Sequence, residues 1–311
     1  MRLTTKTLLV AASAAAVASP AAAQASAQTF ASDLEQPTQV AAQNGTVVWW
    51  QYDPAKQAST LKASIGGAAA TDLAPEIAVK GDAPQIDIGF GNTGAPVAVT
   101  VVDGEIVRIN VQAGTVTKWK PSATPTGASV YWDRVMYLTG SKGNRALHLA
   151  YFGDSKRDRV VARGNIDSAE LGWDYSVFVD HVRKGPVTTY RLRRIHNAGG
   201  RASTVYSVGY GGASFGAITR PTIYKPGKSF VFAVTRLGAP GNEIVRYTVK
   251  GRKLAYATGN PRFSSTAWGG DELGLVYGTA LDPTSNDGCV DGGVQYCKVG
   301  STGPLTWRSK R

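Results

Sequence analysis

Cysteine, histidine and methionine are scarce in this chain of 311 residues, which contains two Cys, three His and two Met. Two thiols are too few for a disulfide-stapled scaffold or for an all-thiolate zinc site. The histidines, His148, His181 and His196, have neither the H-E-x-x-H nor the H-x-H spacing that brings two imidazoles to one metal. We therefore expect no metal site and no cofactor, and we expect each histidine to be a surface or framework residue.

Long apolar runs and helical periodicity are also missing. No segment after the N-terminal region approaches the roughly 18 consecutive apolar residues of a transmembrane helix. Past residue 30, apolar residues do not recur at intervals of three and four over a window long enough for a helix. The one G-x-S-x-G match, at Gly212–Gly216, is followed by no helix-like pattern and so is not a nucleophile elbow, and no phosphate-binding loop is present. The absence of a reactive motif favours a protein that is not an enzyme.

The N-terminus has the three parts of a secretory signal peptide. Arg2 and Lys6 precede an apolar run from Leu8 to Ala18, and small-x-small sites follow Pro20. We expect residues 1–23 to be the signal peptide, with cleavage possible up to residue 27. Its removal lowers the formal net charge from +12 to +10. The predicted location is secreted or extracytoplasmic, in the periplasm or at the cell surface.

The two cysteines lie close together near the C-terminus. Cys289 and Cys297 are flanked by Gly288, Gly292 and Gly293, which let the chain turn back on itself. In an oxidising compartment we expect a disulfide between them. Closing so short a loop stabilises the fold by about 2–3 kcal/mol.

What the chain does contain is strand-like sequence. The turn pair Asn44-Gly45 precedes the run Thr46–Tyr52, and Asp103-Gly104 separates Val97–Val102 from Glu105–Val111. Further β-rich runs are Ser129–Leu138, Tyr175–His181, Ser229–Thr235, Ile244–Val249, Lys253–Ala257 and Leu273–Thr279. The pattern predicts an all-β protein.

These runs recur in a repeating unit. A strand in each unit begins near Leu61, Val107, Leu147, Tyr190, Val245 and Val294, at a mean spacing of about 47 residues. A propeller blade of four short strands needs about 40–50 residues. We predict one β-propeller over residues 30–311, with six blades of four short antiparallel strands. A pair of β-sandwiches is the rival architecture, but it does not account for the period.

Several segments resemble secreted bacterial TolB-like propellers. They are Pro84–Val99 (PQIDIGFGNTGAPVAV), Glu105–Gly114 (EIVRINVQAG) and the segment from Pro37 to Trp49. The resemblance extends over most of residues 35–307. It implies a propeller with a general role in extracytoplasmic interaction, and it supplies no catalytic residues.

Two tryptophan–carboxylate groups are candidate binding residues. Trp173 precedes Asp174, and Trp268 lies near Asp271, each close to the start of a unit. Flat aromatic side chains beside polar groups are typical of carbohydrate sites. The structural alternative is that these tryptophans pack between blades. The sugar-binding interpretation predicts a carbohydrate-active enzyme, a glycoside hydrolase or polysaccharide lyase, with its site at the propeller mouth.

Positive charge is concentrated in residues 142–201, which hold 12 Lys and Arg against six Asp and Glu. On a strand, Arg191 and Arg193 share one face while Arg194 points to the other. Such a cluster predicts an anion-binding surface, and a solvated basic face is the alternative. Secretion argues against nucleic acid as the partner.

The sequence therefore favours a secreted, non-catalytic propeller that binds a protein or a cell-envelope component. The carbohydrate-active enzyme and the anion-binding surface protein remain as alternatives. We expect a monomer with no transmembrane segment, and the sequence does not identify the partner.

Overall fold

The computed structural model describes residues 30–34, 39–211, 217–224, 231–237, 243–248, 253–258, 263–270, 275–280, 297–299 and 308–309. Within these residues the regular elements are all strands, which confirms the all-β prediction. No helix in this part of the chain has the length and hydropathy of a membrane-spanning segment.

The first three sheets follow one another along the chain, and neighbouring strands are antiparallel in each. The first contains β2 (Val40–Gln43), β3 (Thr46–Asp53), β4 (Ala58–Ile65) and β5 (Thr71–Asp72), with β6 (Ala78–Val79) also paired to β4. The second contains β7 (Ile86–Phe90), β8 (Pro96–Val102), β9 (Glu105–Asn110) and β10 (Val116–Trp119). The third contains β11 (Pro125–Tyr131), β12 (Arg134–Thr139), β13 (Arg145–Tyr151) and β14 (Asp154–Gly164).

The remaining strands form three more sheets. The fourth contains β15 (Ile166–Leu171), β16 (Tyr175–Lys184), β17 (Val187–His196) and β18 (Ser203–Tyr210). The fifth contains β19 (Ala217–Tyr224), β20 (Val231–Leu237), β21 (Glu243–Thr248), β22 (Lys253–Thr258) and β26 (Arg308–Ser309). The sixth contains β23 (Phe263–Gly270), β24 (Leu275–Ala280), β25 (Cys297–Val299) and β1 (Ala31–Leu34).

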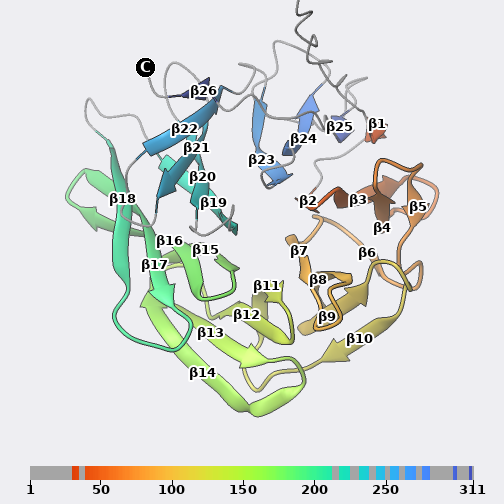
Figure 1. Cartoon of the computed structure of the whole chain (residues 1–311), viewed down its shortest axis with the longest axis horizontal. Coiled ribbons are helices and arrows are strands. Elements are labelled where there is room, and N and C mark those ends of the chain that lie inside the picture. The colour runs from red at the N-terminus through yellow and green to blue at the C-terminus, as the bar shows by residue number, and fades with distance from the viewer. Residues whose placement is uncertain are drawn as a thin grey trace, which may run out of the picture.

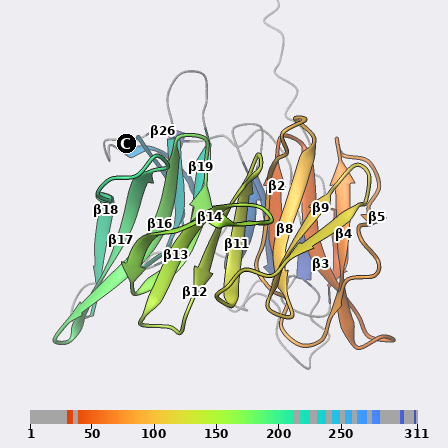
Figure 2. The same cartoon turned by 90° about the horizontal axis from the view of Figure 1, so that it is seen from below.

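The sheets are arranged radially, as the blades of a β-propeller. Figure 1 shows the first strand of each sheet nearest to the centre and the later strands toward the rim. From the side, the strands of neighbouring sheets run between two opposite ends of the ring (Figure 2). The propeller architecture is thus confirmed, and the described strands form six sheets, the number expected from the repeat.

The ring is closed by the first strand of the described chain. β1 pairs with β25 in the sixth sheet, with Ala31 opposite Val299, so one blade contains strands from both ends of the sequence. Phe30, just before β1, packs on Trp49 with ring centroids 6.3 Å apart. Pairing with β1 covers the edge of β25, and radial repetition leaves only short edges on the blades.

The core lies between the blades. The adjacent residues Trp49 and Trp50 of β3 point to opposite faces of their sheet, and both are fully buried. Trp50 packs with Ile88 and Ile109 of the next blade, while Trp49 packs toward Phe30. Both faces of the sheet are therefore apolar, as radial packing requires.

The two turn pairs expected from the sequence are present. Asn44 and Gly45 connect β2 to β3, and Asp103 and Gly104 connect β8 to β9, all four with positive φ. A positive φ at both central positions is the geometry of the two-residue hairpin that these pairs favour. One expectation was wrong: the run Ser129–Leu138 is two strands, β11 and β12, separated by a turn at Trp132 and Asp133.

Candidate functional site

The first strands of blades two, three and four run in the same direction and are joined side by side. The Val130 N–H donates to Oδ2 of Asp87 over 3.0 Å, and the Leu171 N–H donates to Oγ of Ser129 over 2.8 Å. Further along, the Trp132 N–H donates to the Phe90 carbonyl over 2.6 Å. The turns that follow these strands, residues 91–95, 132–133 and 172–174, therefore lie at one end of the propeller. We call this end the first-turn face.

Two exposed tryptophans meet on the first-turn face. Trp132 is 38% exposed and Trp173 is 41% exposed, and their ring centroids lie 4.6 Å apart with an interplanar angle of 83°. Tyr131 contacts Trp173 edge to face at 5.9 Å. Two nearly perpendicular rings form a corner with two aromatic walls, which we call the tryptophan corner.

The turns that carry these rings are fixed by polar contacts to their backbone. Arg134 Nη2 donates to the Trp173 carbonyl over 2.7 Å, and Arg108 Nη2 donates to the Trp132 carbonyl over 3.2 Å. The amide of Asn197 also donates to the Trp173 carbonyl over 3.0 Å. Trp132 has a φ of 62°, in the left-handed region that a bulky residue rarely occupies. Uncommon backbone geometry of this kind concentrates at functional sites.

A polar cavity of about 190 Å³ opens beside this corner in blade two. Its polar lining comes from Asn92, Thr93, Arg108, Asn110, Thr115 and Thr117. Arg108 links the cavity to the tryptophan corner through its bond to the Trp132 carbonyl. Burial lowers the pKa of the Arg108 guanidinium, and the nearby charge of Asp133 acts in the opposite direction.

Two carboxylates lie on the innermost strands, beneath the turns. Asp87 of β7 binds the Val130 N–H, and Glu170 of β15 accepts hydrogen bonds from the Ile223 N–H and the Thr222 hydroxyl. Asp87 is four residues before Gly91 and Glu170 is three residues before Trp173, and a strand advances about 3.3 Å per residue, so the backbone at these carboxylates lies roughly 10–13 Å below the face. Both are intermediate in exposure.

The surroundings of these carboxylates disfavour their charged forms. Desolvation raises the pKa of Asp87 to about 6, against opposing hydrogen bonds from Ser129 and Val130. Desolvation also raises the pKa of Glu170 well above its ordinary range, and the charge of Asp87 raises it further. Like charges at close range resist simultaneous ionisation. A carboxyl whose pKa is raised toward neutral pH has the chemistry of a general acid, although each of these also ties one blade to the next.

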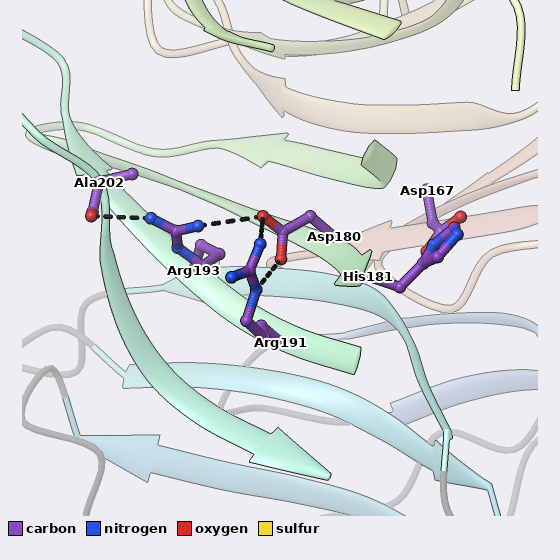
Figure 3. A network of polar contacts seen from close by, with 6 residues as sticks. All are labelled: Asp167, Asp180, His181, Arg191, Arg193 and Ala202. Atoms are coloured by element: carbon purple, nitrogen blue, oxygen red, sulfur yellow. Dashed lines mark hydrogen bonds and ion pairs between the residues drawn. The ribbon is translucent and has the colours of Figure 1, made fainter. Parts of the chain in front are cut away.

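The arginines of the predicted basic cluster lie on β17 of the fourth blade, and two of them bind a carboxylate of the same blade. Arg191 binds Asp180 through two bonds of 2.7 Å, and Arg193 binds the same carboxylate over 3.1 Å (Figure 3). Arg193 also donates to the Ala202 carbonyl. Arg194 is on the other face and donates to the Ser203 hydroxyl, as the strand alternation predicts. An anion at Arg191 and Arg193 would have to compete with Asp180.

The described histidines take part in framework contacts. His181 Nδ1 lies 2.8 Å from Asp167 (Figure 3), and His148 lies between Asp158, at 3.0 Å, and the Thr139 hydroxyl, at 3.1 Å. Tyr137 stacks on His148 and bonds Asp158. No group of three or more metal-binding side chains occurs in the described part of the chain.

The other candidate residues are only partly described. Trp268 lies in β23, the first strand of the sixth sheet, opposite Tyr277. Asp271 and Cys289 fall outside the described residues, and Cys297 lies in β25. The second tryptophan–carboxylate group and the disulfide therefore stay predictions.

Three residues of the site were not identified from the sequence: Trp132, Arg108 and Glu170. Trp132 was assigned to a strand because Trp-Asp is not a common turn pair. Arg108 looks like an outward-facing residue of a regular strand, and Glu170 has no partner nearby in sequence. The spacing of about 40 residues that relates Ser129 to Glu170 is the one signal that aligns such positions.

No protein-family model and no curated protein matches this sequence. Solved structures with a similar arrangement include regucalcin, a calcium-binding protein from Agrobacterium tumefaciens, at 9% identity and a TM-score of 0.45 over 91% of this chain and 96% of that chain. A prolyl endopeptidase is 10% identical, with a TM-score of 0.40 over 91% of this chain and 50% of that one. Hydrazine synthase of Kuenenia stuttgartiensis is 15% identical, with a TM-score of 0.40 over 65% and 63%. The chain thus spans less than two thirds of the latter two proteins, and the propeller fold rests on its own sheet order.

Proposed function

We propose that this protein is an extracytoplasmic propeller that binds a glycan of the cell envelope on its first-turn face. The observation that carries the proposal is the tryptophan corner, where Trp132 and Trp173 expose rings 4.6 Å apart at 83°. A sugar ring can lay its C–H face on one wall and its edge on the other. The signal peptide expected at residues 1–23 and the resemblance to TolB-like propellers support the extracytoplasmic location.

The small size of the aromatic surface favours a glycan over a protein partner. Among the described residues, the large apolar side chains that are more than a third exposed are Ile65, Trp132, Val160, Trp173 and Tyr210. Of these, only the two tryptophans are in mutual ring contact. A protein interface of standard size buries about 800 Å² on each partner, which a corner of two rings does not supply. The hydroxyl and amide groups of the adjacent cavity suit a hydroxyl-rich ligand.

Binding of soluble polysaccharides tests the proposal. Native gels containing a panel of neutral and acidic polysaccharides measure retardation of the whole protein, and calorimetry follows the best ligand. Trp173→Ala is expected to weaken binding by roughly five- to 150-fold, since stacking on an aromatic side chain contributes about 1–3 kcal/mol by analogy with stacked bases. Tyr210→Ala is the matched control, because Tyr210 is an exposed aromatic residue at the opposite end of the fourth blade.

Two results would contradict the proposal. One is unchanged binding in Trp173→Ala. The other is that no polysaccharide in the panel retards the protein, while a purified protein partner binds equally well to the wild type and to Trp173→Ala.

A second candidate function is glycoside hydrolysis at the same face. The raised pKa of Asp87 and of Glu170, both on innermost strands, favours it. Release of reducing ends from a bound polysaccharide, lost in both Asp87→Asn and Glu170→Gln, would support an enzyme. Binding without turnover would support the binding protein. The hydrogen bonds that both carboxylates accept from the next blade favour binding alone.

A further inference from the structure

The cavity beside the tryptophan corner has the chemistry of a site for one anionic sugar. It contains a guanidinium, that of Arg108, with hydroxyl groups of Thr93, Thr115 and Thr117 around it. Asn92 and Asn110 contribute amides, although the Asn110 Oδ1 is already bonded to two N–H groups of its own turn. The lining thus presents one positive charge and several neutral hydrogen-bonding groups.

The guanidinium is available to a ligand. Within residues 39–211, no carboxylate forms an ion pair with Arg108, although the charge of Asp133 acts on it, and its Nη2 donates to the backbone carbonyl of Trp132. This distinguishes it from Arg191 and Arg193, which share Asp180. The guanidinium also lies 5.7 Å from the centre of the Phe152 ring, so one of its faces is shielded from water. A partly desolvated guanidinium binds a carboxylate more strongly than a fully hydrated one.

The backbone at the rim of the cavity keeps the space open. A Cβ atom at Gly91 would lie 3.0 Å from Cγ2 of Val97 and 3.3 Å from Nη2 of Arg108. The absence of a side chain at this position therefore leaves room next to the charge. At about 190 Å³, the cavity is smaller than the roughly 300–1,000 Å³ of sites for whole small molecules. It fits one charged unit of a longer chain.

We propose that Arg108 and its cavity bind the carboxylate of a uronic acid residue in a glycan whose neighbouring sugar stacks on the tryptophan corner. The inference rests on the proposed function and names its ligand class: an acidic polysaccharide. The contact between Arg108 Nη2 and the Trp132 carbonyl places the guanidinium beside the turn that carries the Trp132 ring. A guanidinium provides two parallel donors that match the two oxygens of a carboxylate.

The test compares a uronic acid polymer with its carboxyl-reduced, neutral form. Arg108→Gln is expected to weaken binding of the acidic polymer about tenfold or more, because a hydrogen bond to a charged group contributes enough for that factor. Binding of the neutral polymer should not change. Arg108→Lys keeps the positive charge but loses the two parallel donors of the guanidinium. Its affinity for the acidic polymer should lie between that of the wild type and that of Arg108→Gln. Arg183→Gln is the matched control, because Arg183 is an exposed cation near the opposite end of its blade.

A second measurement needs no variant. In ¹⁵N-labelled wild-type protein, the Arg108 side-chain N–H signal should shift with glucuronate and stay in place with glucose. Acetate at the same concentration should have a much smaller effect, because it lacks the hydroxyl groups that the threonines bind.

Each other outcome overturns the inference. Unchanged acidic binding in Arg108→Gln means that the guanidinium does not bind the carboxylate. Equal loss of both polymers means that Arg108 only supports the Trp132 turn. An equal shift with acetate means a general carboxylate site. If Trp173→Ala still abolishes binding of the neutral polymer, the proposed function survives any of these results, whereas retention of binding in Trp173→Ala contradicts the proposed function alone.

Discussion

Trp132 has a backbone conformation that is unfavourable for its residue type. It occupies the first central position of the two-residue turn between β11 and β12 with a φ of 62°. Glycine is preferred where a tight hairpin turn needs a positive φ, and an L-residue in the left-handed region is disfavoured by about 1–2 kcal/mol. The ring contact with Trp173 stabilises the fold by about 0.5–1.5 kcal/mol. This roughly offsets the backbone cost, so the tryptophan adds little or no stability to the turn.

The first prediction follows from this balance. Trp132→Gly should change the free energy of unfolding by less than about 1 kcal/mol, since relief of the backbone offsets the lost ring contact. Polysaccharide binding should nevertheless fall at least tenfold. Denaturant unfolding and calorimetric titration of the same preparation measure the two quantities. A marked loss of stability with full binding would show that Trp132 serves the fold and not the ligand.

At the scale of the element, the first strands are tied to each other by side chains. Asp87, Ser129 and Glu170 occupy corresponding places in β7, β11 and β15, and each accepts the backbone N–H of the following blade. Close approach accompanies these bonds: a Cβ at Gly89 would lie 2.2 Å from the Val130 carbonyl oxygen. The inner ring of the propeller therefore depends on two desolvated carboxyls, which makes its stability depend on pH.

The second prediction concerns that dependence. A carboxyl whose pKa is raised by folding keeps its proton in the folded state at pH values where the unfolded chain has released it. The free energy of unfolding should therefore fall as the pH rises from about 4 through about 6, the pKa of Asp87, and continue to fall because the pKa of Glu170 is also raised. The slope is at most about 1.4 kcal/mol per pH unit for each carboxyl.

Melting curves between pH 4 and pH 8 measure this slope. The double variant Asp87→Asn with Glu170→Gln should flatten it, because both amides stay neutral and still present a carbonyl oxygen to the next blade. Asp154→Asn is the control, because Arg157 lowers the pKa of the Asp154 carboxyl. Removing this carboxyl should leave the decrease in the free energy of unfolding with rising pH unchanged. A double variant with the wild-type slope would assign the dependence to other groups.

At the scale of the whole molecule, the ring is completed by β1. Pairing of Ala31 with Val299 joins the first described strand to the sixth blade, and Phe30 covers Trp49. Without this strand, β25 becomes an exposed edge and Trp49 loses an aromatic neighbour. Burial of one large apolar side chain alone contributes about 1.5–3 kcal/mol.

The third prediction is that removal of residues 1–34 lowers the free energy of unfolding by about 3 kcal/mol or more and promotes aggregation through the open edge. Removal of residues 1–29 is the matched control and should leave stability close to that of the whole chain. Denaturant unfolding and light scattering measure both effects. Equal stability of the two truncated proteins would show that β1 contributes nothing to closure.

The sequence predicted what depends on local chemistry and on period. Asn44-Gly45 and Asp103-Gly104 marked hairpins because few other residues adopt a positive φ readily, and the spacing of about 47 residues indicated blades. Trp173 was identified because an aromatic residue and a carboxylate are adjacent in sequence. Its contact with Trp132 and the tie between Glu170 and Thr222 join different blades, so no local pattern contains them. Desolvation of a carboxyl likewise depends on residues distant in sequence.

The pairing of β1 with β25 has a consequence for the order of events during synthesis. The strand at residues 31–34 is synthesised well before its partner at residues 297–299, because most of the described chain lies between them. The first four blades can assemble one after another along the chain. The sixth blade cannot be completed until residues 297–299 have been synthesised. Until then, β1 is a single strand without a sheet. The ring can therefore close only once residues 297–299 are available to pair with β1, whichever blades have folded before then.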